Sequence, residues 1–557
     1  MGKGTKKLWI FFIAILLGGL PAEAQKKKKS GSRVPEQPKL VVGIVVDQMR
    51  YDYLYRYWDK YSNEGFKRLL REGFNFRDNH YNYVPTYTGP GHASIYTGTT
   101  PAFHGIVGND WYNRETGRNT YCAEDKSVKT VGSSSKAGEM SPVNMIASTI
   151  TDELKLATNQ KSKVIGLSLK DRGSILPAGH AANAAYWYDG SNGSMISSTY
   201  YMQDLPEWVK AFNKRNLADQ YLSQPWTTLR PLEQYTASTA DDQPFEGTFA
   251  GEQKPVFPHN IPAYRGKTFD MLRAIPAGNT YTKEFAVEAI KAESMGKGAV
   301  TDFLAVSFST TDYVGHQFGP NSIEVEDTYL RLDQDLADFL KFIDGHLGKE
   351  NVLVFLTSDH GGAHNPTYLQ QLRIPAGTTN NIVMADTLEK RLNQKFGKAD
   401  WVSKFMNQQV YLNHNVIESK KVNLIEVQEE VARIMMRLPG VARVFTADNL
   451  LRSNWTAGLG MMVEKGFMYA RSGDVMVVLQ PGWYDNYGRA VVKGTSHGSS
   501  YGYDTHVPLL WYGWQIPAGE TTVRTHITDI APSLAAWLRI QEPNGTMGRS
   551  LVEYVRK

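Results

Sequence analysis

The sequence predicts an α/β protein with a mostly parallel central sheet and helices on both of its faces. Three apolar segments support this fold class, and each leads to an aspartate: Leu40–Val46 to Asp47, Phe303–Phe308 to Asp312, and Val352–Ser358 to Asp359. Continuous apolar runs of this length are typical of strands buried on both faces. Because the carboxyl ends of parallel strands meet at one sheet edge, we expect the three aspartates to lie close together.

The first 24 residues predict a secretory signal peptide. Three lysines within the first seven residues precede an apolar run, Leu8–Leu20, that is short for a membrane span, and Ala22-Glu23-Ala24 forms a cleavage site. Residues 25–38 are expected to be a basic, disordered leader. We therefore expect an exported protein, periplasmic or secreted in a Gram-negative-type bacterium, that has no membrane segment after cleavage.

The composition is that of an ordinary globular protein, with 41% hydrophobic and 21% charged residues in 557. The net charge of +5 is inflated by the lysines of the leader, so it does not indicate nucleic acid binding. Cys122 is the only cysteine, which excludes an intrachain disulfide. We expect Cys122 to be a small packed side chain.

Helices are expected in the segments that connect the strands. Asn63–Glu72 is followed by Gly73, a typical helix stop, and Ile323–Ile343 carries apolar residues at near-helical spacing. Near the C-terminus, Val507–Tyr512 predicts a further core strand and Asp529–Leu538 predicts a last helix.

Residues 39–557 are expected to form one main domain with two insertions. Residues 186–281 are rich in Tyr, Trp, Pro, Gln and Asn, which predicts a loop-rich cap. Residues 385–475 include an amphipathic segment, Val422–Leu438, followed by the strand-like Val441–Phe445, which predicts a small α+β lobe. We expect Val475–Leu479 to belong to the same lobe.

Thr88 stands where a helix is predicted to begin. Threonine is a preferred N-cap residue, Pro90 suits the first turn, and Gly98 suits the helix end. A hydroxyl at this position faces the positive end of the helix dipole, which favours an alkoxide and a bound anion. Most capping threonines have no further role, so the assignment of function depends on the rest of the chain.

The sequence contains a set of mixed carboxylate, imidazole and hydroxyl groups that could form one metal centre: Asp47, Thr88, Asp312, His316, Asp359, His360 and His497. Asp312 and His316 have the i, i+4 spacing that places both on one helix face. These donor types suit zinc. The set is too large for one catalytic zinc and predicts two ions roughly 4 Å apart.

Several other histidines lie in or near these motifs. His364 closely follows the Asp359-His360 pair, and it is the histidine that we most expect to contact a metal-ligating side chain without binding the metal itself. The remaining candidates are expected to be structural: His92, His104, His180 and His506.

The order of these residues resembles the alkaline phosphatase superfamily. The sequences PTYTGPGH and HGIVGNDW, between Phe76 and Trp111, resemble in particular the phosphate-irrepressible alkaline phosphatases that use a threonine nucleophile. The resemblance covers nearly the whole mature chain and makes residues 39–557 its catalytic domain. It implies that Asp312, His316 and His497 hold one zinc and that Asp47, Thr88, Asp359 and His360 hold the second.

The resemblance also implies how substrate binds. Thr88 is the implied nucleophile, Asn109 donates to a phosphate oxygen, and Lys170 and Arg172 contact the remaining oxygens. The spacing of Lys170 and Arg172 agrees, since two residues apart on an extended segment point the same way and suit a phosphate dianion.

The function expected on this basis is an exported, monomeric phosphomonoesterase that contains two Zn²⁺ per chain and hydrolyses small phosphate monoesters through a phosphothreonine intermediate. Two alternatives stay open: a phosphodiesterase or nucleotide pyrophosphatase of the same superfamily, and a non-catalytic exported metal- or phosphate-binding protein. A sulfatase is disfavoured because the Thr88 segment lacks a C/S-x-P-x-R sequence, and a mutase is disfavoured by the export signal.

Overall fold

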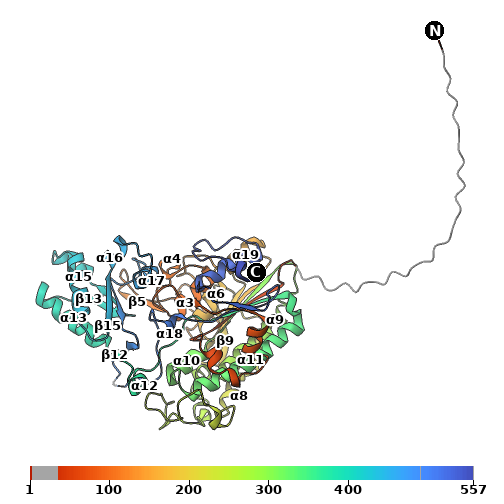
Figure 1. Ribbon diagram of the computed structural model, residues 1–557, viewed down its shortest axis with the longest axis horizontal. Coiled ribbons are helices and arrows are strands. Elements are labelled where there is room, and N and C mark those ends of the chain that lie inside the picture. Colours follow the sequence, from red (N-terminus) through yellow and green to blue (C-terminus); the bar gives the residue numbers. More distant parts are fainter. Residues whose placement is uncertain (3–35, 490, 556–557) are drawn as a thin grey trace. The chain divides into compact units, whose positions relative to one another are not determined.

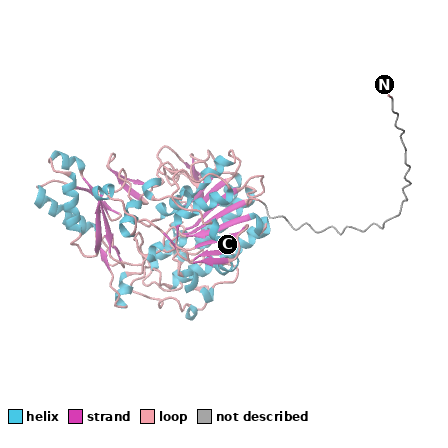
Figure 2. Cartoon of the chain, turned by 45° about the horizontal axis from the view of Figure 1, so that its top comes forward, coloured by secondary structure: helices cyan, strands magenta, loops and turns pink. Residues whose placement is uncertain are grey.

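A ten-stranded mixed sheet forms the centre of the computed structural model, which describes residues 1–2, 36–489 and 491–555 (Figure 2). The signal peptide and most of the basic leader predicted from the sequence lie outside the described residues. Five neighbouring strands of the sheet run parallel, in the spatial order β11 (Val352–Thr357), β1 (Leu40–Val46), β10 (Asp302–Phe308), β7 (Val164–Ser168) and β8 (Ala184–Asp189).

Shorter strands extend the sheet on both sides of this parallel centre. Next to β11 lie β18 (Leu509–Gly513), β2 (Phe74–Phe76) and β19 (Gly519–Thr521), and next to β8 lie β9 (Ser194–Ser198) and β6 (Thr130–Val131). The α/β prediction with a mostly parallel sheet is confirmed. The strands expected at Leu40, Phe303 and Val352 are the three adjacent strands β1, β10 and β11.

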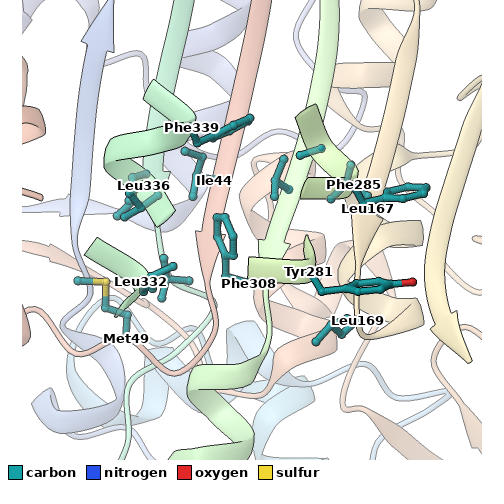
Figure 3. Packing of buried hydrophobic residues seen from close by; sticks show 14 of the residues in the cluster. Ile44, Met49, Leu167, Leu169, Tyr281, Phe285, Phe308, Leu332, Leu336 and Phe339 are labelled. Atoms are coloured by element: carbon teal, nitrogen blue, oxygen red, sulfur yellow. The ribbon is translucent and has the colours of Figure 1, made fainter. Parts of the chain in front are cut away.

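Both faces of the sheet are covered, which explains why its strands are continuously apolar. Val42 and Ile44 of β1 pack into one cluster with α9 (Ala277–Ala292) and α11 (Ile323–Leu347), as Figure 3 shows for Ile44 and Phe339. The alternate residue Val45 packs into a second cluster on the opposite face. Each fully buried Val, Leu, Ile or Phe side chain of these strands contributes roughly 1.5–3 kcal/mol relative to exposure.

The second face is covered by α3 (Thr88–Thr97), α5 (Ile150–Ala157), α6 (Asp171–Ala178) and α19 (Ile530–Leu538). Figure 1 shows α3, α6 and α19 on the side of the sheet away from α9 and α11. The helix predicted at Asn63–Glu72 is the shorter α2 (Phe66–Glu72), which ends at Gly73 as expected. Within the described residues, no helix is both long enough and apolar enough to cross a bilayer.

Thr88 begins α3 but does not cap it, which corrects the prediction by one position. The N-cap is Tyr87, with extended φ and ψ angles of −117° and 162°, and Gly98 ends the helix in the left-handed conformation with φ of 67°. Because Thr88 is the first helical residue, its hydroxyl is not engaged in capping. It points to a different partner, described below.

The α+β lobe lies at the left of Figure 1 and has its own four-stranded sheet in the order β13 (Val402–Met406), β14 (Gln409–Leu412), β16 (Val475–Leu479) and β15 (Val441–Thr446). Helices α13 (Asn381–Phe396) and α15 (Leu424–Met435) pack on this sheet. The predicted segments Val441–Phe445 and Val475–Leu479 are adjacent, antiparallel strands of the lobe.

The predicted cap at residues 186–281 begins inside the central sheet. Tyr186–Asp189 belong to β8 and Ser194–Ser198 form β9, so only the residues after β9 extend beyond the sheet. Those residues contain short helices, including α7 (Glu207–Lys214) and α8 (Leu217–Leu222), and long irregular stretches. The aromatic content that suggested a loop reflects strand residues with both faces buried.

Glu246, a buried carboxyl group in this cap, should make the stability of the fold depend on pH. Burial, together with the nearby Glu324 carboxylate, raises the pKa of Glu246 from its ordinary value of 4.5 to about 9. The native chain therefore keeps a proton that the unfolded chain loses above pH 4.5, so this group's contribution to stability falls as pH rises from 4.5 to 9. We expect Glu246→Gln to raise the apparent melting temperature more at pH 9 than at pH 6, by roughly 2 °C. The exposed Glu233→Gln serves as a control, and a pH-independent difference between Glu246→Gln and wild type would contradict the assignment.

Candidate metal and phosphate site

Three aspartates meet at the carboxyl edge of the sheet, as the strand arrangement requires. Asp47 and Asp359 follow β1 and β11, and Asp312 lies in α10 (Thr310–Phe318) directly after β10. All three side chains are almost completely buried. The edge therefore concentrates negative charge at the position where the topology of parallel sheets places binding sites.

Thr88, Asp47, Asp359 and His360 form one group of donors at this edge. His360 Nε2 is 3.3 Å from Thr88 Oγ1 and 3.6 Å from both Asp47 Oδ1 and Asp359 Oδ2. One ligand atom each of Asp47, Asp359 and His360 lies within 4.8 Å of the others. These four residues are the set that the resemblance implied for one ion.

A second group surrounds Asp312. Its Oδ1 is 3.2 Å from His316 Nε2 and 3.8 Å from His497 Nε2. Ligand atoms of Asp312, His360 and His497 also lie within 4.8 Å of one another, so His360 lies between the two groups. The His360 and His497 rings are stacked, with centroids 3.5 Å apart.

Backbone carbonyls orient all three histidines in the same way. Nδ1 of His316 donates to Thr495 O, Nδ1 of His360 to Gly361 O, and Nδ1 of His497 to Thr86 O, at 2.8–2.9 Å. A carbonyl can only accept, so Nδ1 carries the proton and Nε2 of the neutral ring keeps its lone pair. This arrangement is typical of histidines that bind metal through Nε2.

The residues at this edge fit a bound cation. Asp47 Oδ1 and Asp359 Oδ2 are buried and have no hydrogen-bond partner among the described residues. Burial and the neighbouring Asp47 raise the pKa of Asp359 well above its ordinary value. Adjacent buried carboxylates with free lone pairs are costly unless a positive charge compensates them, and the mixed oxygen and nitrogen donors suit zinc.

Lys170 and Arg172 are placed differently from the prediction that they share one side of an extended segment. Lys170 is the N-cap residue of α6 and Arg172 lies in its first turn. Lys170 Nζ is 2.6 Å from both Asp47 Oδ2 and Asp312 Oδ2 and thus bridges the two groups of donors. Burial lowers the pKa of Lys170, but the two carboxylates outweigh that effect and raise it overall.

Asn109 and Arg172 are each fixed by a hydrogen bond and keep another N–H donor for a ligand. Asn109 Oδ1 accepts a 2.7 Å hydrogen bond from Gly89 N, next to Thr88 in the chain, so Nδ2 is the donor of this amide, and none of the described residues accepts from it. Arg172 Nη1 donates to Tyr121 Oη at 3.0 Å, while its buried Nε has no partner among the described residues. An unpartnered guanidinium donor is suited to an anionic oxygen.

Gln48 and His92 contact the site although the sequence analysis did not select them. Gln48 Nε2 donates to Asp312 Oδ1 at 2.6 Å and its backbone N to Asp359 Oδ1 at 3.1 Å, from a left-handed conformation with φ of 61°. His92 Nδ1 donates to Thr88 O at 2.9 Å and lies 3.4 Å from Asp359 Oδ2. The i, i+4 spacing of His92 from Thr88 was an available signal.

The other histidines named from the sequence contact residues outside the two groups of donors. His364, expected behind a ligand, instead contacts Arg50 and Asn321, neither of which is a predicted ligand. His104 bonds Ser94, His180 bonds Asp152, and His506 bonds the Arg77 carbonyl. The histidine that contacts predicted metal ligands from outside the set is therefore His92 and not His364.

Cys122 is buried and free, in an apolar cluster that includes Ala93 and Trp111. Its backbone N donates to Asn109 O at 2.9 Å. Burial raises the pKa of its thiol, which is consistent with a packed and unreactive side chain.

An α/β sheet with carboxylates and imidazoles at its carboxyl edge, next to a hydroxyl at a helix start, defines the class of protein. Residues 41–504 match the model of the type I phosphodiesterase and nucleotide pyrophosphatase family, so the chain belongs to this family of the alkaline phosphatase superfamily. It is 46% identical to alkaline phosphatase PhoV of Synechococcus elongatus, over 99% of this chain and 100% of PhoV. It is 44% identical to alkaline phosphatase PafA of Elizabethkingia meningoseptica, over 99% of both chains.

Two further similarities extend this result. A protein of Myroides odoratus that is named calcium-transporting ATPase is 49% identical over 94% of this chain and 95% of its own length. The crystal structure of wild-type PafA matches with a TM-score of 0.90 and 44% sequence identity, over 94% of this chain and 100% of that chain. The predicted superfamily and fold are therefore confirmed over nearly the full length.

Proposed function

We propose that this protein is an exported, zinc-dependent phosphomonoesterase that forms a phosphothreonine intermediate on Thr88. The observation that carries the proposal is the position of the Thr88 hydroxyl. It lies at the first residue of α3, 3.3 Å from His360 Nε2. The same nitrogen is 3.6 Å from Asp47 Oδ1 and Asp359 Oδ2, oxygens that have no hydrogen-bond partner among the described residues. A non-catalytic binding protein has no need of a hydroxyl at this position.

Two zinc ions are proposed, held by Asp312, His316 and His497 and by Asp47, Thr88, Asp359 and His360. When bound, zinc lowers the pKa of a coordinated hydroxyl and stabilises charge on the attacking and leaving oxygens. Gln48 would keep the Asp312 and Asp359 carboxylates in place through its two hydrogen bonds.

In the first step, Thr88 Oγ1 loses its proton to water and forms a bond to phosphorus, the bond from phosphorus to the leaving oxygen breaks, and the departing alkoxide takes up a proton from water to become the alcohol. Water then attacks the phosphothreonine, releasing phosphate and restoring the Thr88 hydroxyl. Asn109 Nδ2 and Arg172 Nε supply donors for the non-ester oxygens, which carry the charge of a loose transition state. Lys170 balances the negative charge of Asp47 and Asp312.

Arg172 provides the test of monoester against diester specificity, because a monoester has one more charged oxygen to bind. Arg172→Ala should lower kcat/KM for an aryl phosphate by about 100-fold, the loss of a charge-assisted hydrogen bond, and for the matching methyl aryl phosphate diester by less than about 10-fold. The measurement is steady-state hydrolysis of the two esters by purified protein with known zinc content.

The matched control is Arg118→Ala, which removes an exposed arginine three residues before Tyr121, the residue that accepts a hydrogen bond from Arg172, and it should change neither rate. A wild-type enzyme that prefers the diester, or equal losses on both esters, would favour the phosphodiesterase alternative.

Export and a monomeric state are part of the same proposal. Export is supported by the lysine-rich start, the apolar run and the Ala22-Glu23-Ala24 site. N-terminal sequencing of the protein from its natural host should find a mature chain that begins at Gln25, and light scattering should give the mass of one chain.

A further inference from the structure

We infer that the turn between β13 and β14 of the lobe positions the catalytic groups, which makes Asn407 and Gln408 positioning residues. The inference rests on the function proposed above. The turn contacts the two chain segments that carry Thr88 and Asn109, although it lies some 300 residues away in the sequence.

Each residue of the turn makes one hydrogen bond to one of these segments. Tyr87 Oη donates to Gln408 Oε1 at 3.0 Å, across a sequence separation of 321 residues, and Tyr87 directly precedes Thr88. Asn407 Nδ2 donates to Asp110 O at 2.8 Å, and Asp110 directly follows Asn109. The two bonds therefore act on different catalytic groups.

The turn has a conformationally demanding backbone. Asn407 and Gln408 have φ angles of 51° and 55°, as a two-residue hairpin turn with both central residues left-handed requires. Met406 pairs with Gln409 on either side, and Val477 N donates to Gln408 O at 2.8 Å. Glutamine has no intrinsic preference for this conformation, so its surroundings must maintain it.

Tyr87 transmits the position of the turn to the nucleophile. It is buried, it is the N-cap residue of α3, and its ring packs edge-on against the His497 ring with centroids 5.5 Å apart. A Cβ on Gly498 would lie 2.5 Å from the Tyr87 ring, so the backbone there is in close contact with it. Gln408 Oε1 is the polar group that fixes the end of this ring.

Asp110 transmits the position of the turn to the phosphate-binding donors. It begins the hairpin formed by β4 (Asp110–Asn113) and β5 (Arg118–Tyr121), in which it pairs with Tyr121. Tyr121 Oη in turn accepts the hydrogen bond of Arg172. The lobe also holds the hairpin through Arg114, which donates to Asp474 Oδ2 at 3.1 Å.

Two variants separate the two bonds. Tyr87→Phe removes only the hydroxyl. We expect kcat for an aryl phosphate to fall by about 10-fold and KM to change less than twofold, because the lost hydrogen bond positions the nucleophile Thr88. Asn407→Gly, which keeps the left-handed φ accessible, should weaken inhibition by inorganic phosphate about fivefold, since it acts on Asn109.

Gln408→Asn shortens the acceptor and should reproduce Tyr87→Phe. The double variant of Tyr87→Phe and Gln408→Asn should be no slower than either single variant, because both changes remove the same hydrogen bond. In the double variant of Tyr87→Phe and Asn407→Gly, the two losses should multiply, because the changes remove different hydrogen bonds. The matched control is Gln428→Asn, which breaks a partly buried hydrogen bond from Asp448 N to Gln428 Oε1 within the same lobe. We expect it to lower the melting temperature without changing kcat or KM.

Several results would overturn the inference while the proposed phosphatase activity stands. These are full activity of Tyr87→Phe and Gln408→Asn, additive losses in their double variant, or an equal loss of activity in Gln428→Asn. Absence of phosphatase activity in the wild type would instead remove the proposed function itself.

Discussion

Replacing Thr88 by alanine should abolish the release of phosphate from an aryl phosphate, lowering kcat/KM by about 10⁴-fold or more, as the loss of a nucleophile does in other covalent enzymes. The physical reason is that the Thr88 hydroxyl, at the first residue of α3, lies 3.3 Å from His360 Nε2, among the donors proposed to hold zinc. Zinc content should stay near two per chain, because the carboxylate and imidazole donors remain.

The Thr88 side chain is buried, at 1% exposure, so control variants must match its volume. Thr88→Val keeps its volume and removes only the hydroxyl, so it should be as inactive as Thr88→Ala. Thr88→Ser keeps the hydroxyl and should retain most of the activity. Rapid mixing of Thr88→Ser with substrate and acid quenching should trap phosphate on residue 88. Unchanged hydrolysis in Thr88→Val would rule out the covalent mechanism.

Removal of metal should cause a loss of similar size. After dialysis against a chelator, activity should fall by about 10³-fold or more, and added zinc should restore it. The reason is that the buried carboxylates of Asp47 and Asp359 have oxygens that no described protein group satisfies. Metal analysis should find two zinc ions per chain before dialysis and none after it.

Single ligand changes test how the donors are divided. Asp312→Asn should reduce the zinc content to about one ion per chain, since Asp312 contacts both His316 and His497. His364→Gln is the matched control and should keep two ions, because His364 contacts Arg50 and Asn321 instead. Full activity in a chain shown to be free of metal would contradict the metal centre.

Much of the fold was predictable from local sequence. The segments that form β1, β10 and β11 are continuously apolar because helices cover both faces of the sheet, and this burial is visible in composition alone. The prediction was weaker at Tyr186, where strand residues rich in tyrosine and tryptophan resembled a loop. It was also off by one residue at Thr88, because the tyrosine before it caps the helix through its backbone angles.

The candidate site was predictable only in part. The aspartates could be placed at one edge because each follows a buried strand. The position of Lys170 between Asp47 and Asp312 could not be foreseen, since it depends on how β7 lies beside β10. Gln48 could not be selected from the sequence because glutamine alone does not indicate a functional site. His92 could not be selected because it lies in α3, far in sequence from Asp359, which it contacts.

By itself, the sequence determined which segments are buried strands, which donor residues follow them, and that these donors suit zinc, because hydrophobic periodicity and donor chemistry are properties of neighbouring residues. Only the tertiary structure decided which donors share a group, where Lys170 and Arg172 point, and that the turn at Asn407 reaches the segments of Thr88 and Asn109. Those features arise from contacts between residues hundreds of positions apart, whose geometry no local pattern encodes.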